Sequence, residues 1–125
     1  MNYLALTSLP NVITTIGDYA FDGCINLNFD SLPANLTTIG EWTFGGCESL
    51  TLTDLPTGLE NIGDSAFQGC INLGIKDLPA GIKNIGIWAF YNTGILELDL
   101  RGCTYLSTSS DNYPWGLNSN QIIFE

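Results

Sequence analysis

The chain has 125 residues, of which 45% are hydrophobic and 11% aromatic, enough apolar material for one folded domain. Thirteen acidic residues against three basic ones give a net charge of −10. This balance argues against nucleic acid and anionic membrane as partners, because both are bound through clustered Lys and Arg. Histidine is absent, so the commonest general base and the commonest imidazole metal ligand are missing.

The first ten residues predict neither a signal peptide nor a membrane span. They lack a basic n-region and a cleavage-site pattern, and no run of 18 apolar residues occurs anywhere in the chain. Leu4, Leu6 and Leu9 instead have the spacing of Leu27, Phe29 and Leu32. We therefore expect the chain to begin in the middle of a repeated unit.

A 23-residue repeat organises the sequence from residue 10 onward. Prolines fall at a constant spacing of 23, without insertion or deletion, and several other columns keep the same register. A single unit of this length cannot bury its own apolar face, so each unit must be covered by its neighbours in a stack. The repeated columns are Pro10, Pro33, Pro56 and Pro79; Ile16, Ile39, Ile62 and Ile85; Gly17, Gly40, Gly63 and Gly86; Phe21, Phe44, Phe67 and Phe90; Cys24, Cys47 and Cys70; and Leu27, Leu50, Leu73 and Leu96.

Within a unit, two extended segments and a turn are predicted. Apolar and polar residues alternate in residues 50–52 and their counterparts, which is the period of a half-buried strand. The Leu-Pro pair that follows marks a corner, because proline cannot donate to a sheet. A second extended segment is expected at Leu36 to Ile39. The next Gly suits a corner with positive φ, and residues 17–21 suit a short helix or 3₁₀ turn.

After Leu100 the pattern changes in the way expected of a terminal cap. Residues 101–106 restate the Gly-Cys-x-x-Leu element in a shortened coil, 107–112 are polar and turn-like, and 113–116 form an aromatic turn. Residues 121–125 indicate one last strand. The expected domain is a solenoid over residues 1–106 with a capping segment of the same domain over 107–125.

The repeats closely resemble the BspA-like leucine-rich repeats, whose units read Leu-Pro, an aliphatic residue, then Ile-Gly-x-x-Ala-Phe-x-Gly-Cys-x-x-Leu. Residues 16–24 and 62–70 match this pattern throughout, while Thr43 replaces Ala in the second unit and Asn92-Thr93 replaces Gly-Cys in the fourth. The resemblance implies a right-handed repeat solenoid with short parallel β-strands, short helical or 3₁₀ turns and a C-terminal cap. The form with residues 4–10 and a closing Pro-Trp-Gly is similar to repeats of gut bacteria and their phages, and it implies cell-surface proteins, adhesins or virion appendages.

The cysteine column is expected to be a buried, reduced ladder. Zinc needs four ligands converging on a tetrahedron, whereas one cysteine per coil gives a line, and parallel inward side chains do not meet the geometry of a disulfide. Free cysteine packs as a small hydrophobe. Cys103 is the candidate exception to this arrangement, although it too is expected in the core. No metal or other cofactor is expected.

Two columns are candidates for partner binding. Tyr19, Trp42, Ser65 and Trp88 occupy one column with three large aromatics, and such residues concentrate binding energy at interfaces; the alternative is that they only cover the turn layer. The outward strand positions include Asn28, Thr51 and Glu97 and would line one sheet face, where leucine-rich repeats often bind; the alternative is a solvated face.

Catalytic motifs are missing, so we expect a protein that is not an enzyme. The sequence favours a binding or adhesion module at a bacterial cell surface or virion, recognising a protein or glycan, without nucleic acid binding or membrane insertion. The alternative is a structural spacer of a longer protein with no ligand of its own. An open N-terminal coil would then leave a strand edge and apolar columns unshielded, which favours self-association through that end.

Overall fold

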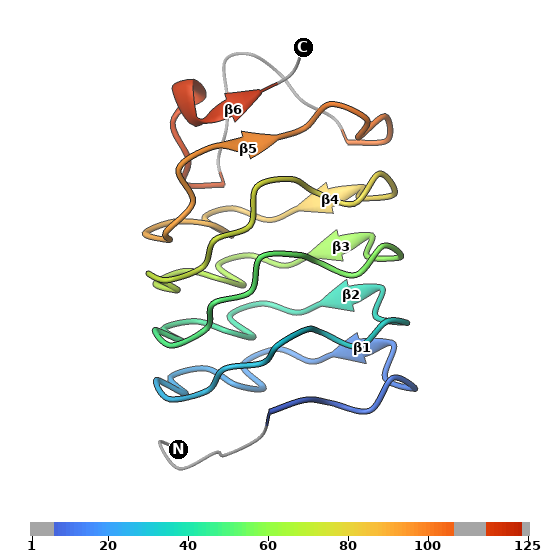
Figure 1. Ribbon diagram of the computed structural model, residues 1–125, viewed down its shortest axis with the longest axis vertical. Helices are drawn as coiled ribbons and strands as arrows, with labels where there is room; N and C mark the ends of the chain where they lie inside the picture. Colours follow the sequence, from blue (N-terminus) through green and yellow to red (C-terminus); the bar gives the residue numbers. More distant parts are fainter. Residues whose placement is uncertain (1–6, 107–114, 124–125) are drawn as a thin grey trace.

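The computed structural model describes residues 7–106 and 115–123. The four complete units, residues 10–32, 33–55, 56–78 and 79–101, form successive coils 1 to 4 stacked along the long axis of the molecule (Figure 1). The predicted repeat solenoid is therefore confirmed.

Each coil contributes one very short strand to a parallel sheet. Strands β1 (Thr15–Ile16), β2 (Thr38–Ile39), β3 (Asn61–Ile62) and β4 (Asn84–Ile85) pair in chain order. Every paired residue lies 23 positions from its partner, as in Thr15 with Thr38. The second extended segment predicted at residues 36–39 thus contains β2, and the Ile of each strand points into the core.

The other predicted strand is regular only at the top of the stack. Strand β5 (Leu98–Asp99) pairs in parallel with β6 (Ile122–Ile123) near the C-terminal end (Figure 1). In coils 1 to 3 the equivalent segment is not a strand, although the Gly74 N–H still donates to the Leu52 carbonyl over 3.1 Å. Two-residue strands suffice because the turn that follows each strand is also bonded to the next coil, as from the Gly23 N–H to the Gly45 carbonyl over 2.7 Å.

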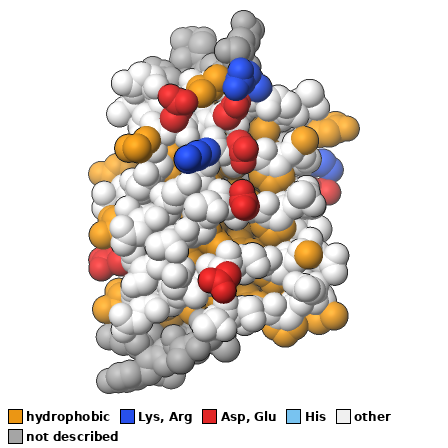
Figure 2. Space-filling model, in the orientation of Figure 1, with side chains coloured by type: hydrophobic (Ala, Val, Ile, Leu, Met, Phe, Trp, Pro, Cys, Tyr) orange, Lys and Arg blue, Asp and Glu red, His pale blue; other side chains and the backbone are white. Residues whose placement is uncertain are grey.

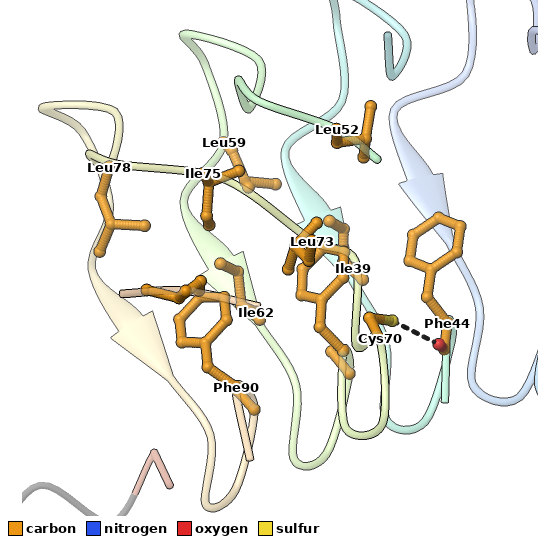
Figure 3. Close-up of a cluster of buried hydrophobic side chains, with 14 of the residues drawn as sticks. Ile39, Phe44, Leu52, Leu59, Ile62, Cys70, Leu73, Ile75, Leu78 and Phe90 are labelled. Atoms are coloured by element: carbon orange, nitrogen blue, oxygen red, sulfur yellow. Dashed lines mark hydrogen bonds between the residues drawn. The ribbon is translucent and has the colours of Figure 1, made fainter. Parts of the chain in front are cut away.

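The core is a set of columns that run through the coils. Figure 3 shows aliphatic, phenylalanine and cysteine side chains from successive coils pointing toward one another. The rings of the phenylalanine column stack nearly parallel, with centroids 5.7, 5.4 and 5.9 Å apart from Phe21 through Phe44 and Phe67 to Phe90. These columns bury the apolar face that a single unit could not cover.

The segment after the Gly that follows each short strand is a chain of single turns. Of the two predicted forms, the short helix is absent there, and the 3₁₀-type turn is found in i→i+3 bonds such as that from the Ala20 N–H to the Gly17 carbonyl (3.3 Å). In the part of the chain that the structure describes, the 3₁₀ helix η1 (Ser119–Gln121) lies near the C-terminal end. The turns form because Tyr19 and its counterparts have positive φ, which interrupts a helix. Alternate N–H groups instead donate to the next coil, as from Tyr19 to Glu41 (2.8 Å) and from Phe21 to Thr43 (2.9 Å).

The Gly that follows each short strand has a different role from the predicted one. Positive φ falls two residues later and at Gly23, Gly46 and Gly69. At Gly63 a Cβ would lie 2.6 Å from the Gly40 carbonyl carbon, and at Gly86 it would lie 2.3 Å from the Asp64 nitrogen. Glycine is needed because consecutive backbones nearly touch at this corner.

The repeat loses its register in coil 4, which corrects the predicted leucine column. Leu96 was expected to follow Leu73 into the core, but it is 87% exposed and Ile95 is buried in its place. Asp99 accordingly bridges to Asp77, 22 residues away instead of 23. Gly94 permits the shift, because a Cβ there would lie within 2.8 Å of the carbonyl oxygens of Ile71 and Leu73.

The segment after coil 4 keeps the local geometry of the Gly-Cys element, as predicted. Gly102 has positive φ like Gly23, and the Cys103 N–H donates to the Leu100 carbonyl over 3.0 Å as Cys24 donates to Phe21 over 3.1 Å. The element lies above the corner at Leu78 and Pro79, whose carbonyl oxygens accept from the Cys103 thiol. Trp115 is buried at the end of the core, and β6 confirms the last predicted strand within residues 121–123. The predicted polar turn at 107–112, residues 113–114 and residues 1–6 lie outside the described residues.

Candidate functional site

The predicted aromatic column coincides with a strained position of the backbone. Tyr19, Trp42, Ser65 and Trp88 have φ of 61°, 54°, 55° and 61°, respectively. This left-handed conformation is disfavoured for residues with a Cβ and costs about 1–2 kcal/mol each relative to glycine. Large aromatic residues with positive φ are unusual, and the backbone of this fold does not require a large side chain at this position.

The column does not form a continuous stripe. Tyr19 is 54% exposed in coil 1 and its hydroxyl donates to Glu41 over 3.4 Å. Trp42 is half-buried, with its indole over Gly45, where an added Cβ would meet the ring. Ser65 is buried. The structure therefore separates the predicted residues into Tyr19 at one end and Trp88 at the other.

A compact aromatic patch forms around Trp88. Its indole is 52% exposed and stacks on Tyr91 with ring centroids 5.3 Å apart and planes at 27°. Ile87 precedes Trp88 in the chain and is also exposed. We define Ile87, Trp88 and Tyr91 as the aromatic patch. Stacked, half-exposed rings next to an aliphatic side chain are typical of residues that anchor a partner.

Two members of the patch were missed by sequence reasoning, although a signal was present. Ile87 follows Asp18, Glu41 and Asp64 in a column that is otherwise acidic. Tyr91 follows Asp22, Gly45 and Gln68, a column with no other aromatic. In both columns, coil 4 thus has a large hydrophobic residue where the other coils have none, and this residue is exposed.

The polar strand face is largely used for holding coils together. The Asn28 side-chain oxygen accepts from both the N–H and the hydroxyl of Thr51 at 3.1 Å, so these two predicted binding residues bind each other. Glu97 lies apart from them and lines a hollow of about 530 Å³ beside β5, which also contains Lys76, Leu96 and Arg101. The predicted set thus does not form one site.

The cysteine column is buried and without disulfides among the described residues, which confirms the predicted reduced ladder. The Cys47 and Cys70 thiols donate to the carbonyl oxygens of Phe21 and Phe44, in the coil below. Burial raises the pKa of Cys47 to about 12, and the pKa of Cys70 is raised further for the same reason. These thiols are protonated and inert at neutral pH. Thr93 takes the fourth position and donates to Phe90.

The described part of the chain contains no candidate metal site. Residues 7–106 and 115–123 have no group of three or more His, Cys, Asp or Glu side chains placed to hold an ion. No helix among the same residues is long and apolar enough to cross a membrane. The aromatic patch and the hollow beside β5 are the candidate functional sites.

Comparison with known proteins places the chain in a family. The family model described as "BspA type Leucine rich repeat region" matches residues 2–110 in six copies. The chain belongs to the BspA-type leucine-rich repeat family. Six copies agree with four complete leucine-rich repeats and partial units at both ends. No curated protein matches the chain.

Two solved leucine-rich repeat structures are similar to the chain. A leucine-rich repeat protein from Bacteroides ovatus is 33% identical over 79% of the chain, with a TM-score of 0.65. The T. pallidum leucine-rich repeat protein is 27% identical over 75% of the chain, with a TM-score of 0.56. The chain spans 29% and 61%, respectively, of their lengths. Leucine-rich repeats of this kind are typically protein-interaction modules and generally not enzymes.

Proposed function

We propose that this leucine-rich repeat solenoid is a non-catalytic binding module that recognises a protein or glycan through the aromatic patch of coil 4. The observation that carries the proposal is Trp88, which is held at positive φ, half-exposed, and stacked on Tyr91. Glycine would relieve the backbone at this position, so the bulky ring persists at a cost in stability. A binding role accounts for that cost.

The surroundings of the patch support a fixed recognition surface. The Ile87 N–H donates to the Asp64 carboxylate over 2.9 Å, and the Phe90 N–H donates to the Trp115 carbonyl over 2.8 Å. Both bonds tie the turn that carries the patch to its neighbouring layers. A pre-ordered patch loses little conformational entropy when a partner binds. Display at a bacterial cell surface or on a virion is the setting we propose for such a module.

The test compares the wild-type chain with the double variant Trp88→Gly, Tyr91→Ala. Glycine keeps the positive φ, so the variant should fold, and the fold is checked by circular dichroism. We expect binding of a labelled chain to an array of glycans and extracellular proteins to weaken at least about tenfold for its best ligand, because such aromatics dominate interface energy.

Tyr105→Ala provides the control, because Tyr105 is more exposed than either patch residue and lies outside the patch. It should bind like the wild type. The proposal is refuted if the folded double variant binds its ligand as tightly as the wild type does.

A structural spacer is the second candidate, and the lower surface of coil 1 favours it. A Cβ on Gly17 would meet nothing within 4 Å, whereas the equivalent Gly40, Gly63 and Gly86 are packed against the coil below. Gly17 is therefore a glycine of the kind that internal coils need for close packing, but no described residue packs against it. On the spacer reading, another coil or a second copy of the chain packs there, and Gly17→Val would block that packing without a clash inside the chain.

A further inference from the structure

A groove runs along the face that carries β5, apart from the aromatic patch. Three hollows of about 530, 500 and 380 Å³ adjoin one another along coils 4 to 1. The upper and middle hollows share Asp77, Asp99 and Arg101, and the middle and lower ones share Asp54, Leu55 and Thr57. We call this continuous surface the groove.

In the middle and lower parts of the groove, Arg101 is paired with Asp99, and the other acidic residues have no basic partner within the described part of the chain. Asp54 and Asp77 line them, and neither carboxylate takes part in either ion pair found among the described residues, which join Lys83 to Glu60 and Arg101 to Asp99. Figure 2 shows acidic side chains following one another down this face. No basic residue precedes Lys76, although eight acidic ones do, so the lower coils present a negative field to a partner.

The upper part of the groove combines charge with an apolar wall. Two of the three basic residues of the chain, Lys76 and Arg101, line it. The Arg101 guanidinium is occupied by a fork of bonds to Asp99, the shortest 2.8 Å, whereas Lys76 has no ion pair among the described residues. Beside them stands Leu96, which the register shift of coil 4 turns outward. Leu96 is thus accessible from the groove, and an apolar group that packs on it removes apolar surface from water.

We propose that the groove binds an extended, basic segment of a partner protein. Its lysine or arginine side chains lie against Asp54 and Asp77, an apolar side chain packs on Leu96, and a carboxylate meets Lys76. The groove crosses about three coil spacings of roughly 4.8 Å, which matches four to five extended residues at about 3.3 Å each. Lys76 lines only the upper hollow and Asp54 only the middle and lower ones, and this difference fixes the direction in which the segment lies.

The probe is a fluorescent hexapeptide with two lysines, one leucine and a free carboxyl terminus, and its matched partner has glutamine in place of both lysines. Binding to the chain is measured by fluorescence polarisation at fixed salt. We expect the lysine peptide to bind and Asp54→Asn with Asp77→Asn to weaken it about tenfold. The pair Asp22→Asn with Glu48→Gln removes the same charge outside the groove and should change binding less than about twofold.

A steric test uses two glycines whose Cβ would meet nothing within 4 Å, Gly74 in the groove and Gly58 outside it. Gly74→Gln should reduce binding of the lysine peptide, and Gly58→Gln should not. Equal weakening by both charge pairs would show unspecific attraction and overturn the proposal, as would binding of glycans but not of the lysine peptide. The aromatic-patch variant should bind this peptide normally, so this proposal and the proposed function can fail separately.

Discussion

Glycine at the corner after each short strand shows how one absent side chain sets the spacing of the stack. At Gly86 a Cβ would lie 2.3 Å from the Asp64 nitrogen, and at Gly17 it would meet nothing. The sequence shows the column but not its reason, because a glycine needed for close approach and a glycine needed for positive φ look the same. Only the position of the neighbouring coil distinguishes them.

The glycine column predicts opposite effects of the same substitution. Gly86→Ala should destabilise the chain by about 1–3 kcal/mol, because two backbones must separate to admit the methyl group. Gly17→Ala should change stability by less than about 1 kcal/mol, on the stabilising side, because it lowers only the entropy of the unfolded chain. Urea denaturation of both variants measures the difference, and equal losses would contradict the close-approach argument.

The buried thiols predict a loss of stability in alkali. The pKa of Cys47 rises from its ordinary value of 9.0 to about 12 in the fold, and that of Cys70 is raised in the same direction. Between pH 9 and 12 the unfolded thiols lose protons while the folded ones keep them. The free energy of unfolding should therefore fall as pH rises above 9, by up to about 1.4 kcal/mol per pH unit for each thiol.

Urea unfolding at pH 7.5 and pH 10 measures this slope. The variant Cys47→Ala with Cys70→Ala provides the comparison, because it keeps the other titrating groups and removes these two. A slope unchanged by the double substitution would show that the two thiols do not contribute.

Among the structural elements, the stacked columns could be predicted and the turns could not. The Phe, Ile and Cys columns follow from the 23-residue period, since side chains in register must face the same core. Residues 17–21 were expected to form a short helix or 3₁₀ turn from their composition. Their conformation is set by hydrogen bonds to the next coil, such as Tyr19 to Glu41, which no local pattern reveals.

In coil 4, the sequence likewise did not reveal which residues of the candidate site are exposed. Leu96 keeps the column spacing in sequence, yet the register shift that Gly94 permits, seen in the Asp77–Asp99 bridge, exposes it. The aromatic column was identified correctly as a set of residues, but Trp42 packs on Gly45 while Trp88 stacks on Tyr91 at the surface. The choice between covering and exposing a ring depends on which residue stands three positions later.

The phenylalanine column predicts unequal costs along the stack. Phe67 lies between Phe44 and Phe90 and is fully buried, so Phe67→Ala should cost about 3–5 kcal/mol. Phe21 has a ring neighbour in one adjacent coil only and is partly exposed, so Phe21→Ala should cost less. Urea denaturation checks the order, and near-native stability of Phe67→Ala would contradict the stacking.

At the level of the whole molecule, charge and architecture favour a module that acts singly. Coil 1 carries Asp18, Asp22 and Asp30 and no basic residue, so two copies meeting through their lower surfaces would bring like charges together. The aromatic patch lies in coil 4, away from that surface, and the groove runs from coil 4 to coil 1 along the face that carries β5. A binding module needs its surfaces free, whereas a spacer needs its ends joined.

Light scattering coupled to size-exclusion chromatography, on the wild-type chain over a concentration series at physiological salt, tests this most directly. The binding-module account predicts the mass of a 13.5 kDa monomer at every concentration. Mass that grows with concentration, and returns to the monomer value in Gly17→Val, would contradict it and support a spacer that joins through coil 1.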